Sequence, residues 1–120
     1  MSSMDVLVVT KEHETAEAIQ SVLASSRGAG MLGVCRDVAE LRARLSKPHQ
    51  NGRLGVAVVD IDQNPDQMLY DLGKVTVSHP KTRFVVLSKD FSEQLVLRAM
   101  QAGARQFLRK NSITLELDET

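Results

Sequence analysis

Short apolar runs rich in β-branched residues alternate along the chain with segments whose apolar residues recur at helical spacing. The runs are Val6–Val9, Met31–Val34, Val56–Ile61, Phe84–Leu87 and Gln106–Leu108. Continuous apolar runs of this length are typical of strands buried on both faces. Strands that alternate with helices predict a parallel sheet covered on both sides. We therefore expect an α/β fold of three layers around a five-stranded parallel sheet.

Four segments between these runs carry apolar stripes at spacings of three and four residues, as amphipathic helices do. The stripes are formed by Ala16, Ile19, Val22 and Leu23; by Val38, Leu41 and Leu45; by Met68, Leu69, Leu72 and Val75; and by Val96, Ala99 and Met100. Asn64-Pro65 is typical of a helix start, and Gly103 of a helix end. No full stripe follows Lys110, so we expect the fifth helix to be short or absent, with residues 112–120 truncated or frayed.

Size and composition restrict the classes of function. At 120 residues the chain is expected to form a single domain, 1–120, with residues 1–4 as a tail. Fifteen basic and fifteen acidic residues cancel, so no global charge attracts nucleic acid or a membrane surface. No apolar run is long enough to span a bilayer, and the lone Cys35 fits a reducing compartment. These features indicate a cytoplasmic protein that binds neither nucleic acid nor a membrane.

Polar residues stand where the predicted strands end. Asp60, Ser88 and Lys110 close the third, fourth and fifth runs, and Thr10 and Lys11 follow the first. In open α/β sheets, binding sites are built outside the carboxyl ends of the strands. The sequence therefore predicts one polar pocket that contains these five side chains.

The stretch from Phe84 to Lys110, with its FVVLS strand, its A-G-A turn at 102–104 and its aromatic Phe107, resembles the response-regulator receiver (CheY-like) family. The resemblance spans Asp5 to about Asn111 and implies a flavodoxin-like fold. It places Asp60 at the phosphoacceptor position and Phe107 at the switch aromatic. It also implies that Lys110 pairs with phosphoryl oxygens and that the hydroxyl of Ser88 swings to bind them.

The chain departs from this family where the family holds Mg²⁺. The family has an acidic pair after the first strand, and Thr10 and Lys11 occupy those positions. Because Mg²⁺ is a hard cation that prefers carboxylate oxygens, we expect no metal site and at best weak Mg²⁺ binding. We expect Glu12 to be a solvated acid that points elsewhere and Asp62 to be an ordinary loop acid.

Asp60 needs a counter-ion if it is buried at a strand end. An unpaired buried carboxylate is costly, so we expect the ammonium group of Lys11 or of Lys110 within salt-bridge reach of Asp60. Such a cluster could persist as a structural feature without any phosphotransfer. We therefore expect a degenerate receiver that takes part in protein–protein interaction.

The alternative is a phosphorylatable receiver of a two-component phosphorelay, which accepts phosphate on Asp60 from a histidine kinase. In that case Asp62 or Glu12 would complete a metal site. An enzyme is not expected, because no nucleophile–base pair or metal-ligand set is visible.

Three strings are similar to the N-terminal receiver-like domain of the TadZ/CpaE pilus-assembly family: VVDIDQNPDQMLYDL, HPKTRFVVLS and LVLRAMQAGARQFLRK. The resemblance implies a MinD/ParA-like ATPase domain in the same parent chain. It also implies the Tad/Flp pilus machinery as a partner and recruitment to a cell pole.

The fourth helix is apolar over too wide an arc for one packing face. At about 100° per residue its apolar positions span roughly 220°. We predict that this helix, with the fifth strand, forms a surface for a partner or a homodimer, with Leu95, Leu97 and Met100 as interface residues. Because Leu95 and Leu97 lie well apart around the helix, at least one of them should face outward.

Overall fold

The computed structural model describes residues 4–25, 29–46 and 54–110. Its elements follow one another as β1 (Met4–Val9), α1 (His13–Ala24), β2 (Ala29–Cys35), α2 (Val38–Leu45), β3 (Leu54–Asp60), α3 (Pro65–Ser78), β4 (Arg83–Ser88), α4 (Glu93–Gln101) and β5 (Gln106–Arg109). Each strand includes the core of a predicted run. Met4, which was predicted to belong to a tail, is the first residue of β1. The predicted fifth-helix region, 112–120, lies outside the described residues.

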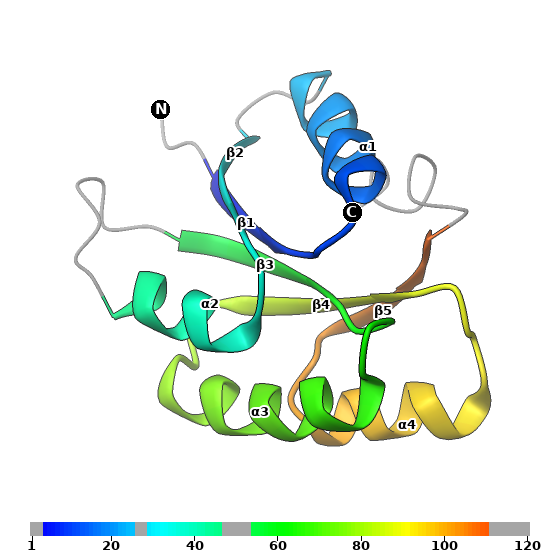
Figure 1. The fold of residues 1–120 in the computed structure, drawn as a ribbon. Helices are drawn as coiled ribbons and strands as arrows, with labels where there is room; N and C mark the ends of the chain where they lie inside the picture. The colour runs from blue at the N-terminus through cyan, green and yellow to red at the C-terminus, as the bar shows by residue number, and fades with distance from the viewer. Residues whose placement is uncertain (1–3, 26–28, 47–53, 111–120) are drawn as a thin grey trace.

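The five strands form one parallel sheet in the order β2-β1-β3-β4-β5. Helix α1 lies on one side of the sheet, and α2, α3 and α4 lie on the other (Figure 1). The predicted three-layer α/β fold with a five-stranded parallel sheet is therefore confirmed. Because all strands are parallel, β1, β3, β4 and β5 all end at the same edge, and this edge carries the polar residues predicted to meet.

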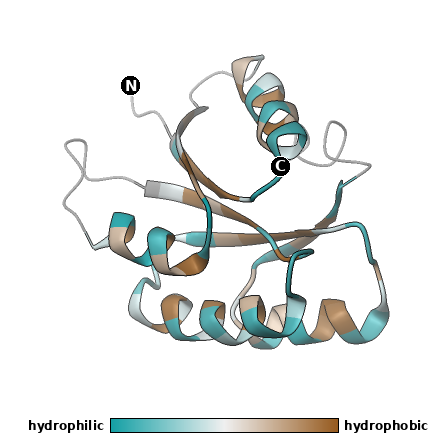
Figure 2. Ribbon diagram, in the orientation of Figure 1, coloured by the Kyte–Doolittle hydropathy of each residue, from teal (hydrophilic) through white to brown (hydrophobic). Residues whose placement is uncertain are grey.

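Successive side chains of each strand enter two separate apolar layers, as the pleat of a strand requires. On the α1 side, Val6 and Val8 pack with Ile19 of the helix. On the other side, Leu7 and Val9 belong to a layer that includes Leu41, Leu72, Leu95 and Ala99. Figure 2 shows the apolar colouring concentrated along the strands between the helices. Burial of each large aliphatic side chain contributes about 1.5–3 kcal/mol, so both layers hold the strand ends in place.

Side-chain caps and one glycine set the helix boundaries. Asn64 caps α3 by accepting from the Gln67 N–H, and Pro65 is its first residue, as predicted. Gly103 follows α4 with φ +104°, and a Cβ there would lie 2.5 Å from Thr76 Oγ1. Only glycine meets both requirements without strain. The turn between α4 and β5 is thereby held against α3.

No helix among the described residues is long and apolar enough to cross a membrane.

Candidate functional site

The predicted polar residues meet at the carboxyl edge of the sheet. Asp60 and Ser88 are the last residues of β3 and β4, and both are buried. Thr10 follows β1 directly and is also buried, while Lys110 follows β5. The sheet thus brings together four of the five predicted pocket residues in one cluster. The fifth, Lys11, is exposed.

The carboxylate of Asp60 is bonded through both of its oxygens. Thr10 Oγ1 donates to Oδ2 at 2.7 Å, and the Asp62 N–H donates to Oδ1 at 3.0 Å. Lys110 Nζ also lies 2.8 Å from Oδ2, and the Asp60 side chain is only 1% exposed. This confirms the predicted salt bridge, with Lys110 as the partner. These three donors all belong to the chain itself.

Lys110 pairs with three carboxylates. Its Nζ lies 2.8 Å from Asp60 Oδ2, from Asp62 Oδ2 and from Glu12 Oε1. Burial alone would lower the pKa of this ammonium, but the hydrogen bonds to Asp60, Asp62 and Glu12 outweigh it, and the pKa is raised. Lys110 is therefore a permanent cation at the centre of the cluster.

Asp62 is a member of this cluster, and its predicted role as an ordinary loop acid is wrong. Ser88 Oγ donates to Asp62 Oδ1 at 2.6 Å, and the Lys89 N–H donates to Oδ2 at 3.1 Å. Burial would raise the pKa of this carboxyl, but the bonds from Lys110, Ser88 and Lys89 N–H together lower it. The reason lies in the loop. The Asp62 N–H bonds to Asp60, which turns the chain back over the end of β3.

Glu12 also joins the cluster, contrary to the expectation that it points elsewhere. It occupies the N-cap position of α1, and its Oε1 accepts from Lys110 Nζ and from Thr15 Oγ1, each at 2.8 Å. The Lys110 bond, followed by the Thr15 bond, lowers the pKa of Glu12. Thr10 Oγ1 accepts from the Glu12 N–H at 3.0 Å, which fixes the backbone there. The sequence feature that could have indicated this contact is the acid Glu12 directly before the predicted helix, with Thr15 three residues later.

Ser88 and Phe107, to which the family resemblance assigns switch roles, both make internal contacts. The Ser88 hydroxyl donates to Asp62 and accepts from the Asp90 N–H at 3.0 Å. Phe107 is buried, with 8% of its surface exposed. Its ring packs edge-on against the ring of Phe91, with 5.5 Å between the two ring centroids. Both side chains are thus engaged in internal contacts.

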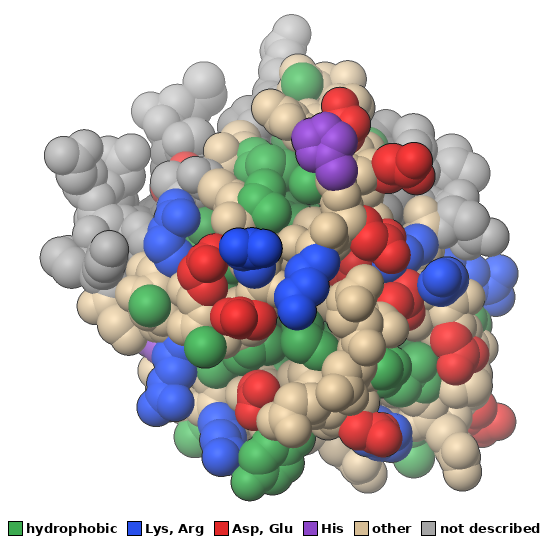
Figure 3. All heavy atoms as spheres, viewed as in Figure 1, with side chains coloured by type: hydrophobic (Ala, Val, Ile, Leu, Met, Phe, Trp, Pro, Cys, Tyr) green, Lys and Arg blue, Asp and Glu red, His purple; other side chains and the backbone are tan. Residues whose placement is uncertain are grey.

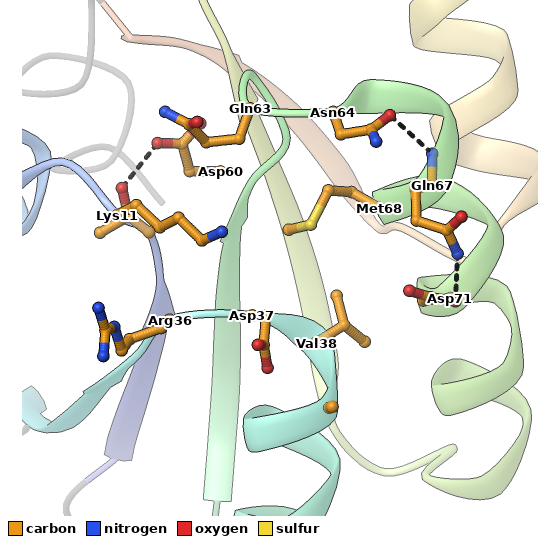
Figure 4. A pocket seen from close by; sticks show the side chains of 12 residues that line it. Lys11, Arg36, Asp37, Val38, Asp60, Gln63, Asn64, Gln67, Met68 and Asp71 are labelled. Atoms are coloured by element: carbon orange, nitrogen blue, oxygen red, sulfur yellow. Dashed lines mark hydrogen bonds between the residues drawn. The ribbon is translucent and has the colours of Figure 1, made fainter.

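Lys11 lies apart from the cluster. Its side chain extends over a hollow that Thr10 and Asp60 also line, toward Met68 and away from the carboxylate of Asp60 (Figure 4). The hollow, of about 290 Å³, is also lined by Arg36 and Asp37, which directly precede α2. Lys11 has no ion pair within the described part of the chain, so it is not the counter-ion of Asp60.

The cluster does not fit a divalent metal ion. Among the described residues, no three acidic, histidine or cysteine side chains are arranged to hold one. Glu12, Asp60 and Asp62 instead surround the Lys110 ammonium. The Thr10 hydroxyl donates to Asp60 and accepts from the Glu12 N–H, so it is already engaged in both directions within the chain. Weak Mg²⁺ binding remains a prediction.

No protein-family model and no curated protein sequence matches the chain. Solved structures do match over nearly its whole length. A response regulator from Thermotoga maritima is 20% identical, with a TM-score of 0.82 over 98% of this chain and 92% of that one. The signal receiver domain of NarL from Mycobacterium tuberculosis is 23% identical, with a TM-score of 0.78 over 99% and 93%. The chain has the receiver fold.

A protein from Burkholderia thailandensis assigned to pilus assembly (cpaE) shares this receiver fold. It is 18% identical, with a TM-score of 0.77 over 97% of this chain and 96% of that one. Its similarity is of the same order as that of the response regulators. These identities relate the chain to all three proteins through the fold alone.

In this receiver fold, α4 presents apolar side chains to the outside. Leu97 and Met100 are 58% and 40% exposed, whereas Leu95 is buried at 6%. The prediction that one leucine faces outward is confirmed by Leu97, and the prediction of Leu95 as an interface residue is wrong, because it packs in the core. Leu97 and Met100 line a shallow hollow together with Phe91, which is 47% exposed. We call Phe91, Leu97 and Met100 the α4 surface.

The fifth strand adds no exposed apolar side chain to the α4 surface. Phe107 and Leu108 are both buried, and only Arg109 of β5 is exposed. The Arg109 guanidinium lies over the Phe91 ring, 4.3 Å from its centroid. The fifth strand, which was predicted to form the partner surface together with the helix, therefore adds a cation beside the apolar surface and no apolar side chain.

Proposed function

We propose that the chain is a receiver-like domain whose pocket is closed by its own side chains, and that it works by binding protein partners rather than by accepting phosphate. It is not an enzyme in this account. The observation that carries the proposal is the state of Asp60. Both of its oxygens are bonded within the chain, and its side chain is 1% exposed.

The chemistry of phosphoryl transfer explains why this arrangement opposes phosphorylation. A carboxylate that attacks phosphorus needs a free oxygen and a cation to neutralise the incoming group. Thr10 and Lys110 both donate to the same Oδ2 of Asp60. Lys110 is in turn engaged by Asp62 and Glu12, so its charge is already balanced. Phosphorylation would have to break several of these bonds at once.

The α4 surface is the proposed site of partner binding. Exposed apolar patches on monomeric domains usually mark interaction sites. The aromatic ring of Phe91 under the Arg109 guanidinium is the type of anchor often found at interfaces. A homodimer through this surface is one form the interaction can take.

We further propose that the parent protein is of the TadZ/CpaE pilus-assembly type. Support comes from the three sequence strings named above and from the similarity in fold to the Burkholderia thailandensis protein. In this proposal an ATPase domain in the same parent chain and the pilus machinery are the partners. The protein would act in the cytoplasm and be recruited to a cell pole.

A phosphorylatable receiver is the second candidate, because Glu12 and Asp62 do lie beside Asp60. Both carboxylates reach the same ammonium as Asp60 does, so the acids which that alternative requires are present at the correct edge. For phosphorylation, Mg²⁺ would have to displace Lys110 from them.

Incubation with Mg²⁺ and a small phosphodonor separates the two candidates. We expect the intact mass of the chain to remain unchanged under conditions that fully modify a typical receiver, included as a positive control. A mass increase of one phosphoryl group that disappears in Asp60→Asn would overturn the closed pocket and favour the second candidate.

Leu97→Asp tests the α4 surface. The matched control is Tyr70→Asp, because Tyr70 is a large exposed residue (63%) on α3 that belongs to no proposed binding surface. We expect Leu97→Asp, and not Tyr70→Asp, to abolish self-association in sedimentation or binding to the parent ATPase domain. Equal effects of both substitutions, or none, would show that the surface is wrong.

A further inference from the structure

A second hollow lies at the opposite edge of the sheet, where β4 and β5 begin. It has a volume of about 310 Å³ and lies between the α3–β4 connection and the α4–β5 turn. The Arg105 N–H donates to the Phe84 carbonyl at 2.7 Å, and Thr76 Oγ1 donates to the Ala102 carbonyl at 2.7 Å. Two connections far apart in sequence are thereby fixed side by side. This hollow is separate from the Asp60 cluster and from the α4 surface.

Every charged residue that lines this hollow is basic. Lys81, Arg83 and Arg105 are exposed, and His79 is half-buried beside them. Across residues 4–25, 29–46 and 54–110, none of these three cations has an ion-pair partner. We call this site the basic hollow. Three positive charges that line one hollow, with no ion pair among the described residues, attract an anionic group.

The chemistry of the lining favours carboxylates. Two of the three cations are arginines, whose planar guanidinium groups bind carboxylates and phosphates through paired N–H donors. Apolar surface adjoins them, because Pro80 and Val77 also line the basic hollow and Val77 is 81% exposed. Acidic side chains alternating with small apolar ones would satisfy both features.

Nucleic acid is a poorer match. The aromatic side chain of the basic hollow, Phe84, is 1% exposed and offers no ring on which a base could stack. Acidic and basic side chains are interspersed over the face shown in Figure 3, without an extended basic surface to follow a phosphate backbone.

We propose that the basic hollow binds an acidic segment of a protein partner, with Arg83 and Arg105 receiving its carboxylates. This site is independent of the α4 surface, so a partner can contact the domain at both places. The proposal also stands if the domain proves to be phosphorylatable, because the basic hollow lies at the other end of the sheet.

Binding of a labelled peptide to the 120-residue chain tests the proposal, with fluorescence anisotropy at low salt as the readout. The probes are a short peptide of alternating Glu and Ala and the same peptide with Gln in place of Glu. We expect the Glu peptide to bind and the Gln peptide not to bind. We expect Arg83→Gln/Arg105→Gln to weaken binding about tenfold, as the loss of two exposed charge contacts implies.

Arg36→Gln/Arg42→Gln is the matched control, since it removes the same charge from two exposed positions elsewhere. We expect this control to bind the Glu peptide as tightly as the unmodified chain does. In an NMR titration, the peptide should shift the amide signals of Gly103 and Arg105 in the control and in the unmodified chain alike. If both double variants lose the same affinity for the Glu peptide, the loss follows from net charge alone and the proposal is overturned. Binding of inorganic phosphate at the same amides without binding of the Glu peptide would overturn it as well, in favour of a small-anion site.

Discussion

At the carboxyl end of the sheet, the Lys110 ammonium is surrounded by three carboxylates, whereas at the amino end Lys81, Arg83 and Arg105 have no ion-pair partner among the described residues. Lys110 is 11% exposed and the other three are exposed. A buried cation needs partners in the folded chain, and an exposed one can leave its charge to solvent or to a ligand. We infer that the first group contributes to folding and closure and the second to recognition.

Replacing the central cation should separate the two ends most clearly. Lys110→Met leaves Glu12, Asp60 and Asp62 without their shared counter-ion, and removing one partner of a buried ion pair costs about 3–5 kcal/mol. Arg105→Met at the amino end should change the free energy of unfolding by less than about 0.5 kcal/mol. Urea denaturation measures both. Equal losses would remove the distinction between the two ends.

The hydroxyl of Thr10 gives a smaller test of the same kind. Thr10→Val keeps the shape but removes the donor to Asp60 and the acceptor for the Glu12 N–H, which should cost about 2 kcal/mol. Thr82→Val, in the basic hollow, is the control, because no hydrogen bond to the Thr82 hydroxyl is among those of the described residues. If unfolding free energies show the two variants to be equally stable, the Thr10 bonds contribute nothing measurable.

The pH dependence of stability should also come from the carboxyl end. The pKa values of Glu12 and Asp62 are lowered on folding from ordinary values of 4.5 and 3.8, so the unfolded chain binds protons first as pH falls. The stability they supply is complete above about pH 5 and is lost as pH drops below 4.5 and then through the folded pKa values.

Urea denaturation between pH 3 and pH 6, values that bracket the ordinary carboxyl range, measures this loss. Glu12→Gln/Asp62→Asn should give a flatter profile than the unmodified chain, while Arg83→Gln/Arg105→Gln should leave the profile unchanged. If the profile of Glu12→Gln/Asp62→Asn is as steep as that of the unmodified chain, the pH dependence of stability comes from other groups.

The residues at the strand ends were predictable because strand periodicity and a parallel sheet determine their position. Asp60, Ser88 and Lys110 each follow an apolar run, and the sheet order places all three at one edge. Glu12 and Asp62 lie in connections, which have no repeating hydrophobic pattern from which the direction of a side chain could be predicted. Their places depend on the hydrogen bonds that Thr10 and Asp60 make to the backbone N–H groups of the two acids.

The α4 helix shows the same limit. Its wide apolar arc was visible in the sequence, but the rotation of the helix against the sheet decides which leucine is buried. That rotation places Leu95 in the core and Leu97 outside. The basic hollow depends on tertiary contact in the same way. Arg83 begins β4 and Arg105 lies in the α4–β5 turn, and the hydrogen bond from the Arg105 N–H to the Phe84 carbonyl brings the two together.

Titration of the labelled chain with Mg²⁺, followed by the amide shifts of Asp60, Asp62 and Lys89, tests the closed pocket most directly. These amides belong to residues that contact Lys110 or its carboxylates. Our account predicts small shifts that rise without saturation, because the Lys110 ammonium already occupies the position between the three carboxylates. Saturation with a dissociation constant of about 10⁻³ M or tighter, in the range of carboxylate cation sites, would show that Mg²⁺ displaces Lys110 and that the pocket is open.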